Sequence, residues 1–391
     1  MFLNKLKENN EKLLHYAFDL HHNGEILPDT YVLDLDAIKE NASLMVKKAN
    51  ELNIELYYML KQIGRNPYIG KMLESVGFKG AVAVDYKEAL TLIDGECHMS
   101  NVGHLVQVPK FALKKVLMAK PDYVTIYSLD IVDEISKICI ENNLTQKVLV
   151  RITDDDAQLY SGQVAGFNSN DLKDILTYIN DKAGVEFGGI TAFPALLYDA
   201  NKNEIVPTDN INGLERAKTI LDILGHKDYM INVPSASCCA SFETARKVAG
   251  DKKCSCEPGH GLTGTTPLHA VNNEVEKVAY CYVSEVCHNF KDKAYCYGGG
   301  HYRRGHMDNC LVGDNYDTLK LVKVKSPDDD SIDYHYELSE NFKVGETCLM
   351  CYRTQIFTTR STVALVEGIS NNNPKLIGLY NSQGEKIQRN W

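Results

Sequence analysis

Eight short runs rich in valine, isoleucine and tyrosine, separated by stretches with helical periodicity, constrain the fold of this chain more than any other feature. Each helical stretch is long enough to carry the chain from one parallel strand to the next. Eight such units over about 210 residues predict a closed (β/α)8 TIM barrel, with an open doubly wound α/β sheet as the alternative. The predicted strands cover residues 54–60, 81–84, 96–99, 123–127, 148–152, 188–193, 230–233 and 253–257.

The chain on either side of this barrel has a different pattern. Near the N-terminus, apolar residues from Leu13 to Phe18 recur at the spacing of an amphipathic helix. From Val271 onward, alternating strand-like segments separated by Gly, Pro and Asp turns replace the helical period. The predicted domains are an N-terminal helical extension at 1–30, a barrel at 31–270 and an all-β domain at 271–391.

Charge and composition exclude several classes of protein. The chain carries 52 acidic and 42 basic residues, and no stripe of Lys and Arg could follow a phosphate backbone, so we expect no nucleic acid partner. The N-terminal segment lacks the apolar core of a signal peptide, and no apolar run reaches the roughly 18 residues of a membrane span. We therefore expect a cytoplasmic protein without a membrane partner.

The 12 cysteines are scattered along the chain, as expected for free thiols in a reducing compartment. Two close pairs, Cys254 with Cys256 and Cys348 with Cys351, could in principle bind zinc. Neither pair has a second CxxC or HxxxH at the matching distance. We therefore predict no metal site.

Lys61 is the first candidate for chemistry, because it directly follows the first predicted barrel strand. Reactive groups of such barrels come from the C-terminal ends of the strands. A lysine that is partly desolvated there favours the neutral amine, which can react with a carbonyl group. Taken alone, the residue fits an ordinary solvated lysine better, so the interpretation depends on its partners.

Two anion-binding loops are predicted after the seventh and eighth strands, which neighbour the first around a closed barrel. Ser235 and Ser237, in the PSAS segment at the start of a helix, could bind a phosphate with their hydroxyls and amides. The EPGHGLTGTTP segment at 257–267 is a glycine-rich turn whose amides can approach an anion closely. A lysine opposite a phosphate loop is the combination that pyridoxal phosphate requires.

On these residues the chain resembles the fold-type III pyridoxal phosphate enzymes, the alanine racemase-like group, and most closely their YhfX-like branch of predicted amino acid racemases. The lead-in YVLDLDAIKEN and its spacing to Lys61 are similar to that group, which implies that Lys61 binds the cofactor covalently. EPGHG resembles the EPGR motif of ornithine and diaminopimelate decarboxylases. That likeness implies that Glu257 faces the ring nitrogen. It also implies a phosphate loop formed by Gly259, His260 and Gly261.

Other positions follow or depart from the family pattern. Arg151, at the end of the fifth strand, lies where the racemases keep an arginine near the cofactor oxygen, although a surface salt bridge is its ordinary explanation. The racemases have an arginine at the ring nitrogen, whereas Glu257 would keep that nitrogen protonated. Arg65 stands where a tyrosine usually follows the lysine. Related D-threonine aldolases and D-serine dehydratases carry a metal-binding His and Cys pair near the C-terminus, whereas the stretch CYRTQIFTTR has neither a His nor a properly placed Cys, which argues against a metal-assisted lyase.

Racemisation through an external aldimine and a carbanion needs a base on each face of the α-carbon. Lys61 supplies one. The second is expected in the segment AYCYGGGHYRRGH, where Tyr297 is the first choice and His301 the second; a glycine-rich hairpin with aromatic packing is the alternative. Since the β-domain of related enzymes closes the neighbouring subunit's site, the resemblance implies a homodimer with shared active sites.

The function expected from these features is a pyridoxal phosphate-dependent amino acid racemase, an isomerase that interconverts L- and D-amino acids. The alternatives are a decarboxylase or a D-amino acid lyase of the same fold, and a non-catalytic carrier of pyridoxal phosphate. The decarboxylase is favoured by EPG, but the cysteine–aspartate substrate motif of those enzymes is missing. The carrier proteins have no second domain, which this chain is predicted to have.

Overall fold

The chain forms two compact units in a computed structural model that describes residues 2–328 and 330–391. Unit 2 comprises Ser43–Leu60 and Pro67–Gly259. Unit 1 comprises the chain up to Ala42, Lys61–Asn66 and His260–Trp391. Each unit is made of segments that are separate in the sequence, so the units do not correspond to single continuous domains. The domain boundaries at residues 30 and 270 therefore stay a prediction.

Unit 2 is the predicted barrel, in which eight parallel strands close into a ring in the order β10-β11-β2-β3-β4-β5-β6-β7. The strands are short and almost wholly buried, as expected for apolar runs covered on both faces. The prediction of eight barrel strands is confirmed, but the third of them, β4, begins at Met99, where we had expected it to end. The strands are β2 (Ile54–Tyr58), β3 (Gly80–Ala83), β4 (Met99–Val102), β5 (Tyr123–Ile126), β6 (Gln146–Arg151), β7 (Val185–Thr191), β10 (Met230–Asn232) and β11 (Lys253–Cys256).

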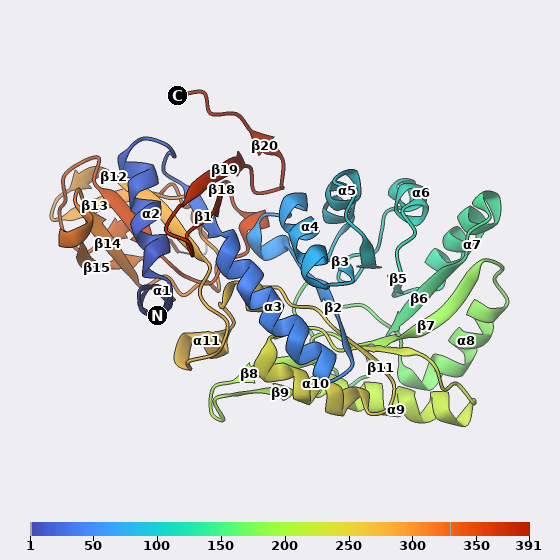
Figure 1. Cartoon of the computed structure of the whole chain (residues 1–391). Helices are drawn as coiled ribbons and strands as arrows, with labels where there is room; N and C mark the ends of the chain where they lie inside the picture. Colours follow the sequence, from blue (N-terminus) through green and yellow to red (C-terminus); the bar gives the residue numbers. More distant parts are fainter. Residues whose placement is uncertain (1, 329) are drawn as a thin grey trace. The chain divides into compact units, whose positions relative to one another are not determined.

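Helices cover the outside of the barrel strands, as Figure 1 shows for α4 to α10. Each carries an apolar stripe on one side; in α8, for example, Leu172, Ile175, Leu176 and Ile179 are all buried. The helices are α4 (Pro67–Val76), α5 (Tyr86–Asp94), α6 (Lys110–Met118), α7 (Asp130–Asn142), α8 (Leu172–Asn180), α9 (Asn210–Ile223) and α10 (Phe242–Ala249). A two-stranded hairpin, β8 (Leu196–Asp199) and β9 (Glu204–Pro207), follows β7, the sixth barrel strand, and was not predicted.

Unit 1 is built on a ten-stranded sheet. Its first strand, β1 (Thr30–Asp34), pairs antiparallel with β12 and parallel with β18, so this strand belongs to the sheet of unit 1 and not to the barrel. The predicted N-terminal helix is two helices, α1 (Phe2–Asn9) and α2 (Glu11–His22), with the break at Asn10. The α3 helix (Leu35–Glu51) then leads towards the barrel sequence.

Six strands of this sheet form a closed ring, because β13 pairs with β12 as well as with β16. The ring runs β12-β13-β16-β15-β14-β17, and β12 also continues the sheet through β1 to β18, β19 and β20. This all-β structure confirms the predicted change of pattern in the C-terminal part. The strands are β12 (Tyr280–Phe290), β13 (Lys293–Tyr297), β14 (Asn309–Gly313), β15 (Lys320–Lys325), β16 (His335–Leu338), β17 (Thr347–Met350), β18 (Thr362–Glu367), β19 (Lys375–Tyr380) and β20 (Lys386–Ile387).

Asp29, just before β1, makes the stability of unit 1 depend on pH. Burial raises the pKa of its carboxyl to about 6, against the opposing effects of Ser361, Tyr282 and Arg360. Below about pH 4 the carboxyl is protonated in both the folded and the unfolded chain. Between about pH 4 and pH 6 only the unfolded chain loses the proton, so folding becomes less favourable as the pH rises.

The Asp29→Asn variant should therefore gain stability over the parent as the pH rises from 4 to 7. Asparagine still accepts the hydrogen bond that the Ser361 hydroxyl donates to Asp29. The gain should approach at most about 3 kcal/mol. Urea unfolding of both proteins at a series of pH values measures it, and a difference that stays constant with pH would contradict the role of Asp29.

All cysteines are free thiols in the described structure, and all but Cys239 and Cys287 are buried. This confirms the expectation of free, mostly buried cysteine. A search of the helices in the described part of the chain finds none with the length and apolar character that crossing a bilayer requires.

Candidate active site

Glu257 directly follows β11 and is enclosed at the C-terminal end of the barrel. Its Oε2 lies 3.2 Å from Nε2 of His104, and both side chains are at most 1% exposed. Asn101 donates from Nδ2 to Glu257 Oε1 at 3.4 Å, and the Asn101 Oδ1 accepts from the Thr125 hydroxyl at 2.8 Å. A buried carboxylate needs such partners, because leaving it unpaired would cost several kcal/mol.

His104 was missed by the sequence analysis. It lies two residues beyond the end of β4, where a side chain can enter the mouth of the barrel. Its position just after a barrel strand could have been seen in the sequence. Because our predicted strand ended at Met99, His104 was assigned to the loop that follows it. The edge of the Phe193 ring system packs against it, with the two ring planes at 90° and their centroids 5.2 Å apart.

Arg151 ends β6 and is 1% exposed, so it is not the surface salt-bridge residue of the ordinary explanation. Its Nη2 donates to the Gln163 carbonyl at 3.0 Å, and the guanidinium lies over the Tyr127 ring at 5.3 Å. Burial lowers the pKa of this guanidinium, and the neighbouring Tyr127 opposes that effect. Among the described residues, the buried Nε and Nη1 lack a hydrogen-bond acceptor of normal geometry. Both are suited to an anionic oxygen of a ligand.

The turn after β10 holds Ser235 and Ser237 in an unusual backbone conformation. Ser235 has φ 74° and Ala236 φ 46°, two successive positive values in residues other than glycine. Such strain is found mostly at ligand sites. The Ser235 hydroxyl accepts from the Ala195 amide at 3.1 Å, and the Ser237 hydroxyl accepts from the Glu257 amide at 3.2 Å. The two hydroxyls therefore already fix the turn, and they tie it to Glu257.

Lys61 opens the short helix η1 (Lys61–Ile63), three residues after β2 ends. Within unit 2, the Met59 amide donates to the Pro258 carbonyl at 2.9 Å, and β2 pairs with β11. The backbone that leads to Lys61 is thus tied to the backbone that follows Glu257.

His260 begins the short helix η4 (His260–Thr263) and is buried within unit 1. Its Nδ1 lies 3.4 Å from the Thr265 hydroxyl and its Nε2 lies 3.3 Å from Nε2 of Gln355. Burial lowers the pKa of His260 well below its usual value, and the positive charges of Arg353, Lys61 and Arg304 lower it further. The imidazole is therefore neutral at physiological pH, in a region of positive potential.

Tyr297 and His301, the expected second bases, both lie in unit 1. Tyr297 ends β13, pairs with His335, and is 41% exposed. The His301 amide donates to Asp333 Oδ2 at 2.9 Å. The preceding glycines permit close packing: a Cβ on Gly299 would lie 1.8 Å from Asp29 Oδ2.

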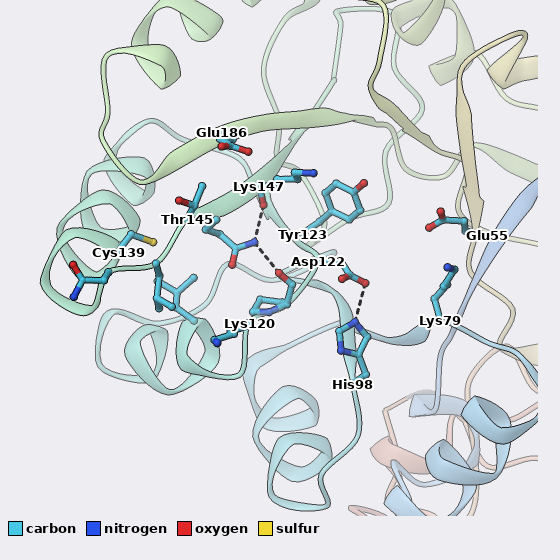
Figure 2. Close-up of a pocket in the computed structure, with 15 residues that line it drawn as sticks. Glu55, Lys79, His98, Lys120, Asp122, Tyr123, Cys139, Thr145, Lys147 and Glu186 are labelled. Atoms are coloured by element: carbon cyan, nitrogen blue, oxygen red, sulfur yellow. Dashed lines mark hydrogen bonds and ion pairs between the residues drawn. The ribbon is translucent and has the colours of Figure 1, made fainter.

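A polar depression of about 750 Å³ lies at the opposite, N-terminal end of the barrel strands (Figure 2). Two of its side chains pair with each other: His98 Nε2 lies 2.9 Å from Asp122 Oδ2. Catalytic groups of such barrels come from the other end. The candidate site is therefore the C-terminal end of the barrel, which carries Glu257, His104 and Arg151.

The fold and the chemistry of this end define an alanine racemase-like protein of fold type III. Residues 33–267 match the family model described as "Alanine racemase, N-terminal domain", and residues 281–376 match "YhfX-like, C-terminal domain". The uncharacterized protein YhfX of Escherichia coli K12 is 37% identical over 388 residues, which cover 99% of this chain and 100% of that protein. The chain belongs to the YhfX-like family of the alanine racemase-like, pyridoxal phosphate-dependent proteins.

Solved structures show the same fold at low sequence identity. D-threonine aldolase from Filomicrobium marinum is 16% identical with a TM-score of 0.66, over 91% of this chain and 94% of that one. Alanine racemase of Clostridium difficile 630, in complex with cycloserine, is 15% identical with a TM-score of 0.63, over 91% and 99% of the two chains. These neighbours catalyse different reactions, so the fold does not select among them.

The residues present fit pyridoxal phosphate, the cofactor that this fold family generally uses. A buried carboxylate held by His104 and Asn101 suits a protonated ring nitrogen. The buried Nε and Nη1 of Arg151, which find no acceptor among the described residues, suit a ring oxygen. A strained serine turn at the start of a helical segment suits a phosphate.

Proposed function

We propose that this protein is a pyridoxal phosphate-dependent amino acid racemase. The observation that carries the proposal is the buried Glu257, held by His104 and Asn101 at the end of β11. The neighbouring strand β2 leads to Lys61. The all-β structure of unit 1 supports catalysis over a carrier role, because a carrier needs the barrel alone. A cytoplasmic location stays a prediction.

Lys61 is the residue that would hold the cofactor, through its ε-amino group. The same amine would act as a base beside the α-carbon of a bound amino acid, where it would take or return the proton. When bound, pyridoxal phosphate withdraws electrons from that carbon.

Glu257 is proposed to hold a proton at the ring nitrogen of the cofactor. Its negative charge makes loss of that proton unfavourable, and its contacts with His104 and Asn101 fix the orientation of the carboxylate. Arg151 would donate to the ring oxygen through the buried Nε and Nη1, for which the described residues offer no hydrogen-bond acceptor. For the phosphate we propose the turn with Ser235 and Ser237, together with the loop segment formed by Gly259, His260 and Gly261.

The second base is proposed to come from the partner chain of a homodimer with shared sites. A single lysine returns a proton to the face from which it took it, so inversion needs a donor on the opposite face. Tyr297 is 41% exposed, which suits a group that acts in a neighbouring subunit. His301 is the second candidate.

Separate Tyr297→Phe and His301→Asn variants test this proposal. One of them should still exchange the α-proton of one enantiomer, yet racemise more slowly by roughly 10² to 10⁴. The comparison of deuterium incorporation with optical inversion measures the effect. The shared-site proposal fails if both variants racemise at the parental rate, or if the protein is fully active as a monomer at the assay concentration.

Product analysis tests the reaction class. The protein, saturated with pyridoxal phosphate, is incubated with each L-amino acid, and the products are separated by chiral chromatography. A racemase gives the D-enantiomer with the total amino acid unchanged. Release of carbon dioxide and an amine would instead make the protein a decarboxylase, and release of an aldehyde, a keto acid or ammonia would make it a lyase. If no amino acid gives any of these products, the result would favour the alternative that the protein is a non-catalytic carrier of pyridoxal phosphate.

A further inference from the structure

Outside the barrel, three metal-ligating side chains meet where the six-stranded ring of unit 1 closes. Cys287 and His288 lie on β12 and His335 lies at the start of β16, with β13 between the two strands. Their sulfur and imidazole nitrogen atoms all lie within 4.8 Å of one another. The sequence analysis predicted no metal site, and the spacing from 288 to 335 gave no signal for one.

A bulge in β12 explains how two successive residues come to face the same side. Val286 pairs with Cys296 and His288 pairs with Tyr295, so Cys287 is an extra residue opposite a single step of β13. In a regular strand, side chains at 287 and 288 would point to opposite faces. The bulge cancels this alternation locally. As a result the Cys287 Sγ lies 2.7 Å from the His288 Nδ1.

The two histidines are held by packing and strand register. The His288 ring stacks on Tyr295 at a centroid distance of 4.9 Å with 6° between the planes. Tyr295 in turn donates its hydroxyl to Glu337 Oε2 at 3.2 Å. The His335 ring meets His288 edge-on, with centroids 4.9 Å apart and 80° between the planes. Two imidazoles at right angles can direct lone pairs towards one point, whereas two stacked ones cannot.

We propose that Cys287, His288 and His335 bind a divalent ion of the zinc class. A tetrahedral ion with bonds of about 2.0 Å to nitrogen and about 2.3 Å to sulfur needs ligand atoms about 3.3 to 3.5 Å apart. The ligand atoms lie between 2.7 Å and at most 4.8 Å apart, a range that includes these separations. One thiolate and two imidazoles prefer zinc over magnesium or calcium. The three protein ligands leave a fourth position for water.

The ion would connect β12 to β16 across β13, at the seam that closes the ring. This site is distinct from the Lys61 and Glu257 chemistry and does not depend on the proposed racemase activity. Aromatic packing alone is the competing explanation for the cluster. It requires the rings but no thiol, and it gives no reason for the bulge to turn Cys287 towards them.

Metal binding by the full-length chain tests the proposal. The purified protein is stripped with a chelator, dialysed against zinc, and its bound zinc is measured by elemental analysis. The variants Cys287→Ser and His335→Asn are compared with the controls Cys239→Ser and His98→Asn, which change a partly exposed cysteine and a partly exposed histidine outside the cluster. The parent and both controls should hold about one more zinc per chain than the two cluster variants.

Cobalt provides a second readout. Cobalt added to the parent should give tetrahedral visible bands and a thiolate-to-metal charge-transfer band, and Cys287→Ser should lose the latter. His335 is exposed, so His335→Asn should fold normally, and its circular dichroism and Tm without metal check that it does. Equal zinc content in the parent and the correctly folded His335→Asn, or cobalt bands that survive Cys287→Ser, would overturn the proposal.

Discussion

Replacement of Lys61 by alanine is expected to lower α-proton exchange by roughly 10² to 10⁴ and to remove the yellow colour of lysine-bound pyridoxal phosphate. The variant loses both the amine that holds the cofactor and the base that acts at the α-carbon. Exchange followed by proton NMR and the visible absorption spectrum measure the two effects independently.

Lys79→Ala is the matched control for this experiment. Lys79 also adjoins a barrel strand, but it precedes β3 and lines the depression at the N-terminal end of the barrel (Figure 2). This variant should keep its colour and its exchange rate. Reduction with borohydride followed by peptide mapping locates the labelled lysine. Label on another residue, or unchanged absorption in Lys61→Ala, would rule out the assignment.

Replacement of Glu257 by glutamine is expected to lower α-proton exchange by roughly 10² to 10³ while the cofactor stays bound. Glutamine has the same shape and can still accept from Asn101. It carries no charge to hold a proton at the ring nitrogen, and a neutral ring withdraws electrons less well. The variant should therefore lower the rate of α-proton exchange at saturating substrate more than it lowers the affinity for the cofactor.

Glu276→Gln separates this effect from simple loss of a buried pair. Glu276 Oε2 lies 3.1 Å from His269 Nε2, and both side chains are at most 3% exposed, much like Glu257 and His104. The pair belongs to unit 1 and has no proposed role in the reaction. Exchange should survive in Glu276→Gln. If it fell equally in both variants, or in neither, the role of Glu257 at the ring nitrogen would be wrong.

The barrel was predictable because its strands are buried on both faces and so form short apolar runs between helices. The bounds of one barrel strand, β4, were not predicted correctly. The predicted strand covered residues 96–99 (ECHM), whereas β4 covers Met99–Val102, so the two share only Met99. Three further buried residues follow Met99 in the strand. That shift decided whether His104 counted as a strand-end residue. The hairpin of β8 and β9 escaped because its residues show no apolar alternation.

The contacts that give each site its character depend on distant parts of the chain. Arg151 could be named from the sequence, but its burial under Tyr127 and Phe193 could not. The metal-ligating group needs the bulge at Cys287 and the closure of β13 onto β12, and neither leaves a mark in local composition. The type of residue at a strand end can therefore be predicted from the sequence, whereas the residues that it contacts become known only from the three-dimensional structure.

The central claim is that this chain labilises the α-proton of an amino acid and returns it to either face. Incubation of the pyridoxal phosphate-loaded protein with each L-amino acid in deuterium oxide tests it directly, with NMR for the α-position and polarimetry for inversion. The account predicts that at least one amino acid loses its α-proton signal and its optical rotation together. Full retention of both for every amino acid, in a protein that carries the cofactor on Lys61, would contradict it.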